Sequence, residues 1–152
     1  MIDAEVLVDS KKWKKIIQNP KKIVLNTLNK FPKKYKFIGK NVYISILLTN
    51  NEKIKLLNKK FRKKNKATDI LSFPFFEAKK LKKNLKNKKI YLGDIAISYE
   101  EFRKKNKKNY LDGFIKIFIH GFLHLLNFDH KLQKDYKMMN SIENKIYQEI
   151  KG

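Results

Sequence analysis

The chain has 152 residues, of which 42% are hydrophobic, and this is enough for one globular domain with its own core. It has no cysteine, which excludes disulfides and thiolate metal sites and is compatible with a reducing compartment. Its 37 Lys and Arg residues against 14 acidic residues give a formal net charge of +23, which favours a polyanionic partner such as a nucleic acid.

The charge indicates a class of partner but no reaction. A general drift in composition toward Lys, Asn and Ile would produce the same charge without any such partner. The first residues lack the basic and apolar regions of a signal peptide. The most apolar segment, residues 114–126, is shorter than the roughly 20 residues of a membrane span. We therefore expect a soluble, cytoplasmic protein.

The hydrophobic pattern predicts alternating strands and helices along the chain. Strands are predicted where apolar and β-branched residues gather, at residues 2–8, 41–49, 67–73 and 90–97, with a bulge at Gly93. Helices are predicted after Ser10, from Pro20, from Asn51, after Ser98 in a capping box, over 113–126 with Asp112 as its cap, and from 132 onwards. The lysine-rich segment 77–89 is predicted to be a solvated loop or a short exposed helix.

These elements predict a single α+β domain over residues 1–152. We expect a four-stranded sheet, mixed or mostly antiparallel, packed with helices around a central buried helix. That helix is the one over residues 113–126, because its sequence is apolar nearly all round.

All three histidines of the chain, His120, His124 and His130, fall within eleven residues. The first two are four residues apart, so a helix places them on one face. Asn127 tolerates the left-handed conformation and can turn the chain so that His130 joins them. Three imidazoles with one position left open are typical of catalytic zinc. The alternative is three histidines hydrogen-bonded inside an apolar core, which their ligand-like spacing disfavours.

The spacing His-x₃-His-x₅-His also matches the metzincin protease pattern. Gly121, however, occupies the position of the general-base Glu of those proteases, and Asn127 that of their turn glycine. A zinc ligand set without this base argues against peptide hydrolysis.

Three motifs together resemble the YbeY family of bacterial rRNA maturation factors, which are regarded as zinc-dependent, single-strand-specific endoribonucleases. The motifs lie at residues 57–74, 92–98 and 120–130, and the resemblance extends over roughly residues 50–146. The chain departs from the family at Asn127-Phe128, where Gly-Tyr is common, and at Lys116, where many members carry a further histidine.

The resemblance implies a role for several residues. His120, His124 and His130 would bind one Zn²⁺, and Arg62 would be a catalytic residue that binds phosphate oxygens bidentately. The residues themselves add further candidates: Lys59 and Lys63, in the lysine run over residues 59–66, would contribute to RNA binding. The carboxylates that could orient a zinc ligand or act as a general base are Asp69, Asp94 and Asp129. Each of these side chains could instead be an ordinary exposed residue or a turn cap.

By the same resemblance we expect the chain to act in 16S rRNA 3′-end maturation and in the biogenesis and quality control of the small ribosomal subunit, its expected partner. Either a metal-activated water or the 2′-hydroxyl of the substrate would attack the phosphorus. The alternative is a non-catalytic ribosome-assembly factor with a structural zinc site, which would unfold when it loses the metal.

Overall fold

The computed structural model describes residues 2–32, 41–128 and 133–151. His130 and Asp129, two of the predicted site residues, lie outside these ranges.

The fold is built on one four-stranded sheet with the strand order β1-β2-β4-β3. The strands are β1 (Ile2–Val8), β2 (Asn41–Thr49), β3 (Ile70–Pro74) and β4 (Lys89–Ser98). β1 pairs with β2 and β2 with β4 in parallel, whereas β3 pairs with β4 in the antiparallel direction. The sheet is mixed, as predicted, but parallel pairings outnumber antiparallel ones because the connections from β1 to β2 and from β2 to β4 both cross over the sheet.

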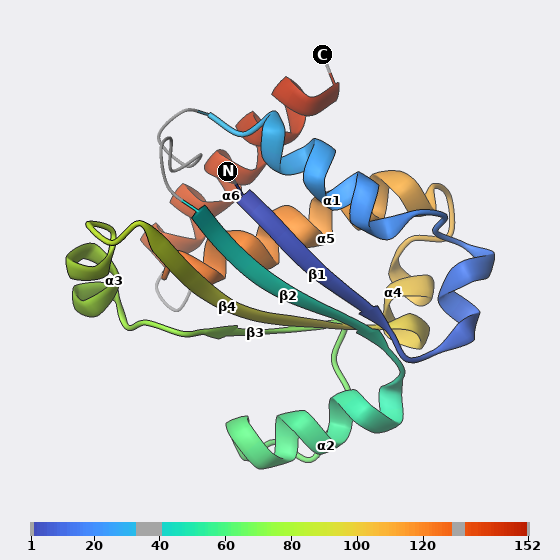
Figure 1. Cartoon of the computed structure of the whole chain (residues 1–152). Helices are drawn as coiled ribbons and strands as arrows, with labels where there is room; N and C mark the ends of the chain where they lie inside the picture. Colours follow the sequence, from blue (N-terminus) through green and yellow to red (C-terminus); the bar gives the residue numbers. More distant parts are fainter. Residues whose placement is uncertain (1, 33–40, 129–132, 152) are drawn as a thin grey trace.

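Helices cover the two faces of the sheet unequally, as Figure 1 shows. On one face lie α1 (Pro20–Asn29), α5 (Tyr110–Leu125) and α6 (Gln133–Lys151). The opposite face carries α2 (Asn51–Arg62) near the end of β2. The remaining helical segments are the 3₁₀ turn η1 (Lys11–Lys15), α3 (Ala78–Asn84) and α4 (Tyr99–Lys105). None of the helices in the described ranges is long and apolar enough to cross a membrane.

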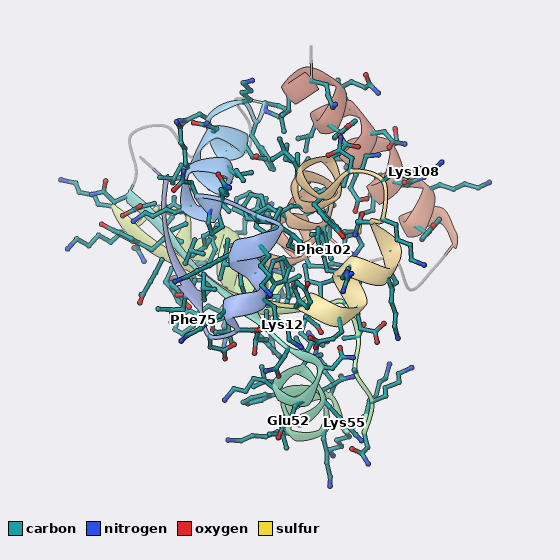
Figure 2. The ribbon with its side chains drawn as sticks, turned by 90° about the vertical axis from the view of Figure 1, so that its right-hand side faces the viewer. Lys12, Glu52, Lys55, Phe75, Phe102 and Lys108 are labelled. Atoms are coloured by element: carbon teal, nitrogen blue, oxygen red, sulfur yellow. The ribbon has the colours of Figure 1, made fainter. Side chains whose placement is uncertain are left out.

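The main core lies between the sheet and α5, the helix predicted to be central and buried. Phe114, Phe118 and Phe122 of α5 are almost completely buried, together with Ile44 and Ile46 of β2. A smaller cluster on the other face joins Ile54 of α2 to Leu71 and Ala96. In Figure 2 Phe102 lies in the interior, while Lys55 and Lys108 project outwards. The charge of the chain is therefore carried by a solvated shell around an ordinary apolar core.

The predicted bulge at Gly93 is confirmed by a shift of register between β2 and β4. Gly93 has φ +136°, and a Cβ atom there would lie 2.2 Å from the carbonyl oxygen of Phe73. Only glycine adopts this φ without strain and has no Cβ atom to collide with Phe73.

Two of the predicted helix caps differ in the structure. α5 begins at Tyr110 because Asn109, rather than Asp112, caps it by accepting a hydrogen bond from the Asp112 amide at 3.0 Å. α4 does begin after Ser98, but no capping box forms. The two side chains of the predicted box, Ser98 and Glu101, bond instead to Asn51 at the start of α2: the Ser98 hydroxyl donates to its amide oxygen, and Glu101 accepts from its amide nitrogen at 3.3 Å. A tertiary contact thus replaces the local one.

Candidate active site

A pocket of about 610 Å³ lies between the C-terminal half of α5 and the segment that runs from α2 into β3. His120 and His124 line it from α5, and Arg62, Asp69 and Ser72 line it from the other side. The structure therefore brings together residues that are about 60 positions apart in the sequence.

The two histidines face each other across one turn of α5. Their Nε2 atoms are 3.1 Å apart, and their ring centroids are 4.6 Å apart with an interplanar angle of 78°. Nδ1 of His120 lies 2.5 Å from Oε1 of Glu143 on α6. Because a carboxylate oxygen accepts, this contact favours the tautomer of His120 in which Nδ1 carries the hydrogen and Nε2 is the nitrogen without it.

This pair of nitrogens fits the edge of a zinc site. Tetrahedral Zn²⁺ with Zn–N distances of about 2.0–2.1 Å places two ligand nitrogens about 3.3 Å apart, close to the observed separation. A carboxylate on the second ring nitrogen is the usual partner of a metal-ligating histidine. Within the ranges that the structure describes, no group of three His, Cys, Asp or Glu side chains could hold a metal. The predicted third ligand, His130, lies outside these ranges.

Gly121 explains how the histidine helix comes so close to the sheet. A Cβ atom at this position would lie 2.7 Å from Cδ1 of Ile70 and 3.3 Å from Cδ1 of Ile95. The hydroxyl of Ser72 donates to the carbonyl of Gly121 at 3.1 Å. The position that carries the general base in metzincin proteases therefore faces the sheet, where a Glu side chain has no room.

Arg62 is held at the pocket by the strand opposite the histidines. One guanidinium nitrogen donates to the carbonyl of Ser72 at 2.5 Å, and the guanidinium carbon lies 5.6 Å from the centre of the Phe73 ring. Arg62 is thus tied to Ser72, and Ser72 to Gly121 beside the first histidine. These two hydrogen bonds fix the position of Arg62 relative to the helix that carries the histidines.

The predicted RNA-binding lysines do not line the pocket. Lys59 is exposed on α2, and Lys63 ends that helix in the left-handed conformation with φ 58°. The chain reverses there, so that Lys64 and Lys66 line the pocket instead. Lys64 and Lys66 belong to the same lysine run over residues 59–66 as Lys59 and Lys63, and this run as a whole was the candidate for contacts with RNA phosphates.

The structure separates the predicted carboxylates. Asp69 lies in the pocket wall, where Lys105 contacts it at 3.2 Å. Asp94 does not reach the histidines. Its neighbour Ile95 faces α5, so Asp94 points to the opposite face of β4, as the alternation of a strand requires. There the hydroxyl of Tyr91 donates to it. Partial burial, followed by this hydrogen bond, raises the pKa of Tyr91 to about 12.

The predicted turn after the second histidine is present. Asn127 adopts φ 69°, and its side-chain amide donates to the carbonyl of Phe76 at 2.9 Å. The turn thereby connects the end of α5 with the segment that follows β3.

In this α+β fold, two facing imidazoles lie opposite an arginine across one pocket. This arrangement is that of a candidate phosphodiester hydrolase. The family model described as "Endoribonuclease YbeY" matches residues 7–151. Proteins of that name are 49% identical in Pelagibacter ubique, over 99% of this chain and 97% of the relative, and 37% identical in Ehrlichia canis, over 96% and 92%. The solution structure of a Thermotoga maritima protein matches with a TM-score of 0.58 and 26% identity, over 99% of this chain and 89% of the other.

The chain belongs to the endoribonuclease YbeY family, and the resemblance of its three motifs to that family is confirmed.

Proposed function

We propose that this chain is a zinc-dependent, single-strand-specific endoribonuclease that acts in the cytoplasm on the 3′ end of 16S rRNA precursor, in small-subunit biogenesis and quality control. Membership of the family makes the chain an endoribonuclease, an enzyme that hydrolyses phosphodiester bonds in RNA. The observation that carries the finer proposal is the pocket in which Arg62 lies opposite His120 and His124.

His120 and His124, together with His130, would hold the metal. When bound, Zn²⁺ supplies Lewis-acid activation of water and polarises a phosphoryl oxygen. Glu143 would keep Nε2 of His120 available as a neutral donor. The chemistry of the donor set supports this assignment, because neutral imidazoles are ligands that zinc prefers.

Arg62 would bind the phosphate that is cleaved. Its bond to the Ser72 carbonyl occupies one nitrogen and sets the plane of the guanidinium, which leaves other N–H groups of the fork for phosphate oxygens. Lys64 and Lys66 line the same pocket and would contact backbone phosphates of the strand on either side. The net charge of +23 supports a polyanionic substrate of this kind.

The test uses the two arginines of the chain as a matched pair. Arg62→Lys should abolish cleavage of a single-stranded RNA, whereas Arg103→Lys, on α4, should leave it intact. His124→Ala should lose both cleavage and zinc, measured by metal analysis of protein whose thermal melt shows that it is folded. A duplex of the same sequence should remain uncut.

Equal trace activity in the wild type and in the Arg62→Lys and His124→Ala variants would overturn the nuclease proposal. If the protein also unfolds whenever zinc is removed and still binds small subunits, the assembly-factor alternative holds.

A further inference from the structure

A row of polar contacts joins α5 to α6. We name it the polar seam, and its members are spaced four residues apart on each helix, so that each helix presents them on one face. They are Asp112, Lys116 and His120 on α5, and Glu143, Tyr147 and Lys151 on α6.

The seam is continuous from end to end. At one end Glu143 contacts His120 at 2.5 Å. In the middle the Lys116 ammonium lies 4.6 Å from the centre of the Tyr147 ring. At the far end Asp112 accepts from the Tyr147 hydroxyl and forms an ion pair with Lys151 at 3.4 Å. Each step of four residues back along α5 is matched by a step of four forward along α6.

This pairing selects one register of the two helices. The apolar residues of α6 beside the seam, such as Met139 and Ile146, are buried but form non-directional contacts. A slip of α6 by one turn would bring Met139 or Tyr147 to His120 in place of Glu143. Neither side chain offers a carboxylate to Nδ1. Only the present register also gives Asp112 both of its α6 partners, Tyr147 and Lys151.

We propose that Glu143 is a positioning residue for the metal site and that the Asp112 end of the polar seam keeps it in place. Glu143 fixes the tautomer of His120 so that Nε2 is the donor facing His124. Asp112, through Tyr147 and Lys151, holds α6 in the register in which Glu143 reaches that ring. The inference rests on the proposed function only in taking His120 to be a metal ligand.

The first test reads the tautomer of His120 in metal-free protein by long-range ¹H–¹⁵N correlation, which three histidines make assignable. The wild type should show the Nδ1–H form. Glu143→Leu should give a mixture of tautomers, and Glu143→Gln, whose amide oxygen still accepts, should restore the wild-type form. Glu149→Leu, on the exposed side of the same helix, should match the wild type. If Glu143→Leu fails to fold, Glu143→Ala removes the same acceptor with a smaller side chain.

The second test measures zinc affinity by competition with a chromogenic chelator. Glu143→Leu should weaken zinc binding about 10- to 100-fold, and Glu149→Leu should leave it unchanged. Asp112→Ala should weaken binding in the wild type but have little further effect in the Glu143→Leu background, because it acts through Glu143.

An unchanged tautomer in both Glu143→Leu and Glu143→Ala would overturn the inference. If Asp112→Ala weakened zinc binding equally in the wild type and in the Glu143→Leu variant, the proposed role of Asp112 in placing Glu143 would be overturned. If instead the wild type neither bound zinc nor cut RNA, the proposed function would fail, and the tautomer in metal-free protein would still decide the role of Glu143.

Discussion

Gly121 lets α5 pack directly against Ile70 of β3, since a Cβ atom on Gly121 would lie only 2.7 Å from Cδ1 of Ile70. This contact sets the distance between the histidine helix and the strand that holds Arg62. A substitution of Gly121 should therefore change both the stability of the protein and the width of its pocket.

Gly121→Ala should destabilise the protein by about 1 kcal/mol or more, because overpacking outweighs the gain in helix propensity. In an Ile70→Val background, which lacks the colliding methyl group, the same change should cost at least about 0.5 kcal/mol less. Urea unfolding of the four proteins measures both values. Identical costs in the two backgrounds would show that this contact does not limit the packing.

Asn127 should be replaceable by glycine at lower cost than by alanine. Both substitutions remove the hydrogen bond to Phe76, but only alanine is strained at the positive φ of this turn. Asn127→Gly should therefore be more stable than Asn127→Ala by about 1 kcal/mol, and both less stable than the wild type. Chemical denaturation checks the order. Equal stability of the two variants would argue against a left-handed turn.

Asp112 should make the stability of the protein sensitive to acid. The hydrogen bond from Tyr147, then Lys151 and Lys116, lower the pKa of this carboxyl. A lowered pKa contributes stability that is present above the ordinary aspartate pKa of about 3.9 and lost as the pH falls through the folded value. Below the ordinary pKa, the free energy of unfolding should thus fall more steeply in the wild type than in Asp112→Asn. Asp9→Asn, at an exposed position, is the control and should follow the wild type.

Lys64 and Lys66 should contribute to the salt dependence of RNA binding. Replacing both by alanine should reduce the slope of log affinity against log salt by roughly 0.7 for each phosphate of a single strand that these lysines neutralise. Lys79→Ala with Lys80→Ala makes the same change of charge on exposed α3 and should leave the slope nearly unaltered. Fluorescence anisotropy at several salt concentrations measures it. Equal slopes for the two double variants would show that RNA binding depends on the total charge of the protein and not on the lysines of the pocket.

Local patterns predicted the elements well, because strands and helices are specified by nearby residues. The strands over 2–8 and 41–49 have the predicted bounds, while β3 begins at Ile70 rather than Ala67. The segment before it is held by a side chain of α2, since Asn58 donates to the carbonyl of Lys66 at 2.9 Å. The parallel majority of the sheet was not predictable from periodicity, which does not encode the neighbour of a strand.

The sequence predicted those parts of the site that depend on residues close together in the chain. His120 and His124 face each other because four residues make slightly more than one helical turn. Glu143 was missed because only the packing of α6 on α5 brings it to His120, and the sequence gives no distance between two helices. The side of the sheet to which Asp94 points was not predictable for a related reason, since it follows from the register of the whole sheet.

The place of β3 in the sheet affects when the Arg62 side of the pocket can form while the chain is being synthesised. β3 is made before β4, yet in the sheet order β4 is the strand beside it. Its other support, α5, is made later still. A nascent chain that carries Arg62 and β3 but not yet β4 therefore lacks the strand beside β3, and the pocket is complete only after α5 has been made.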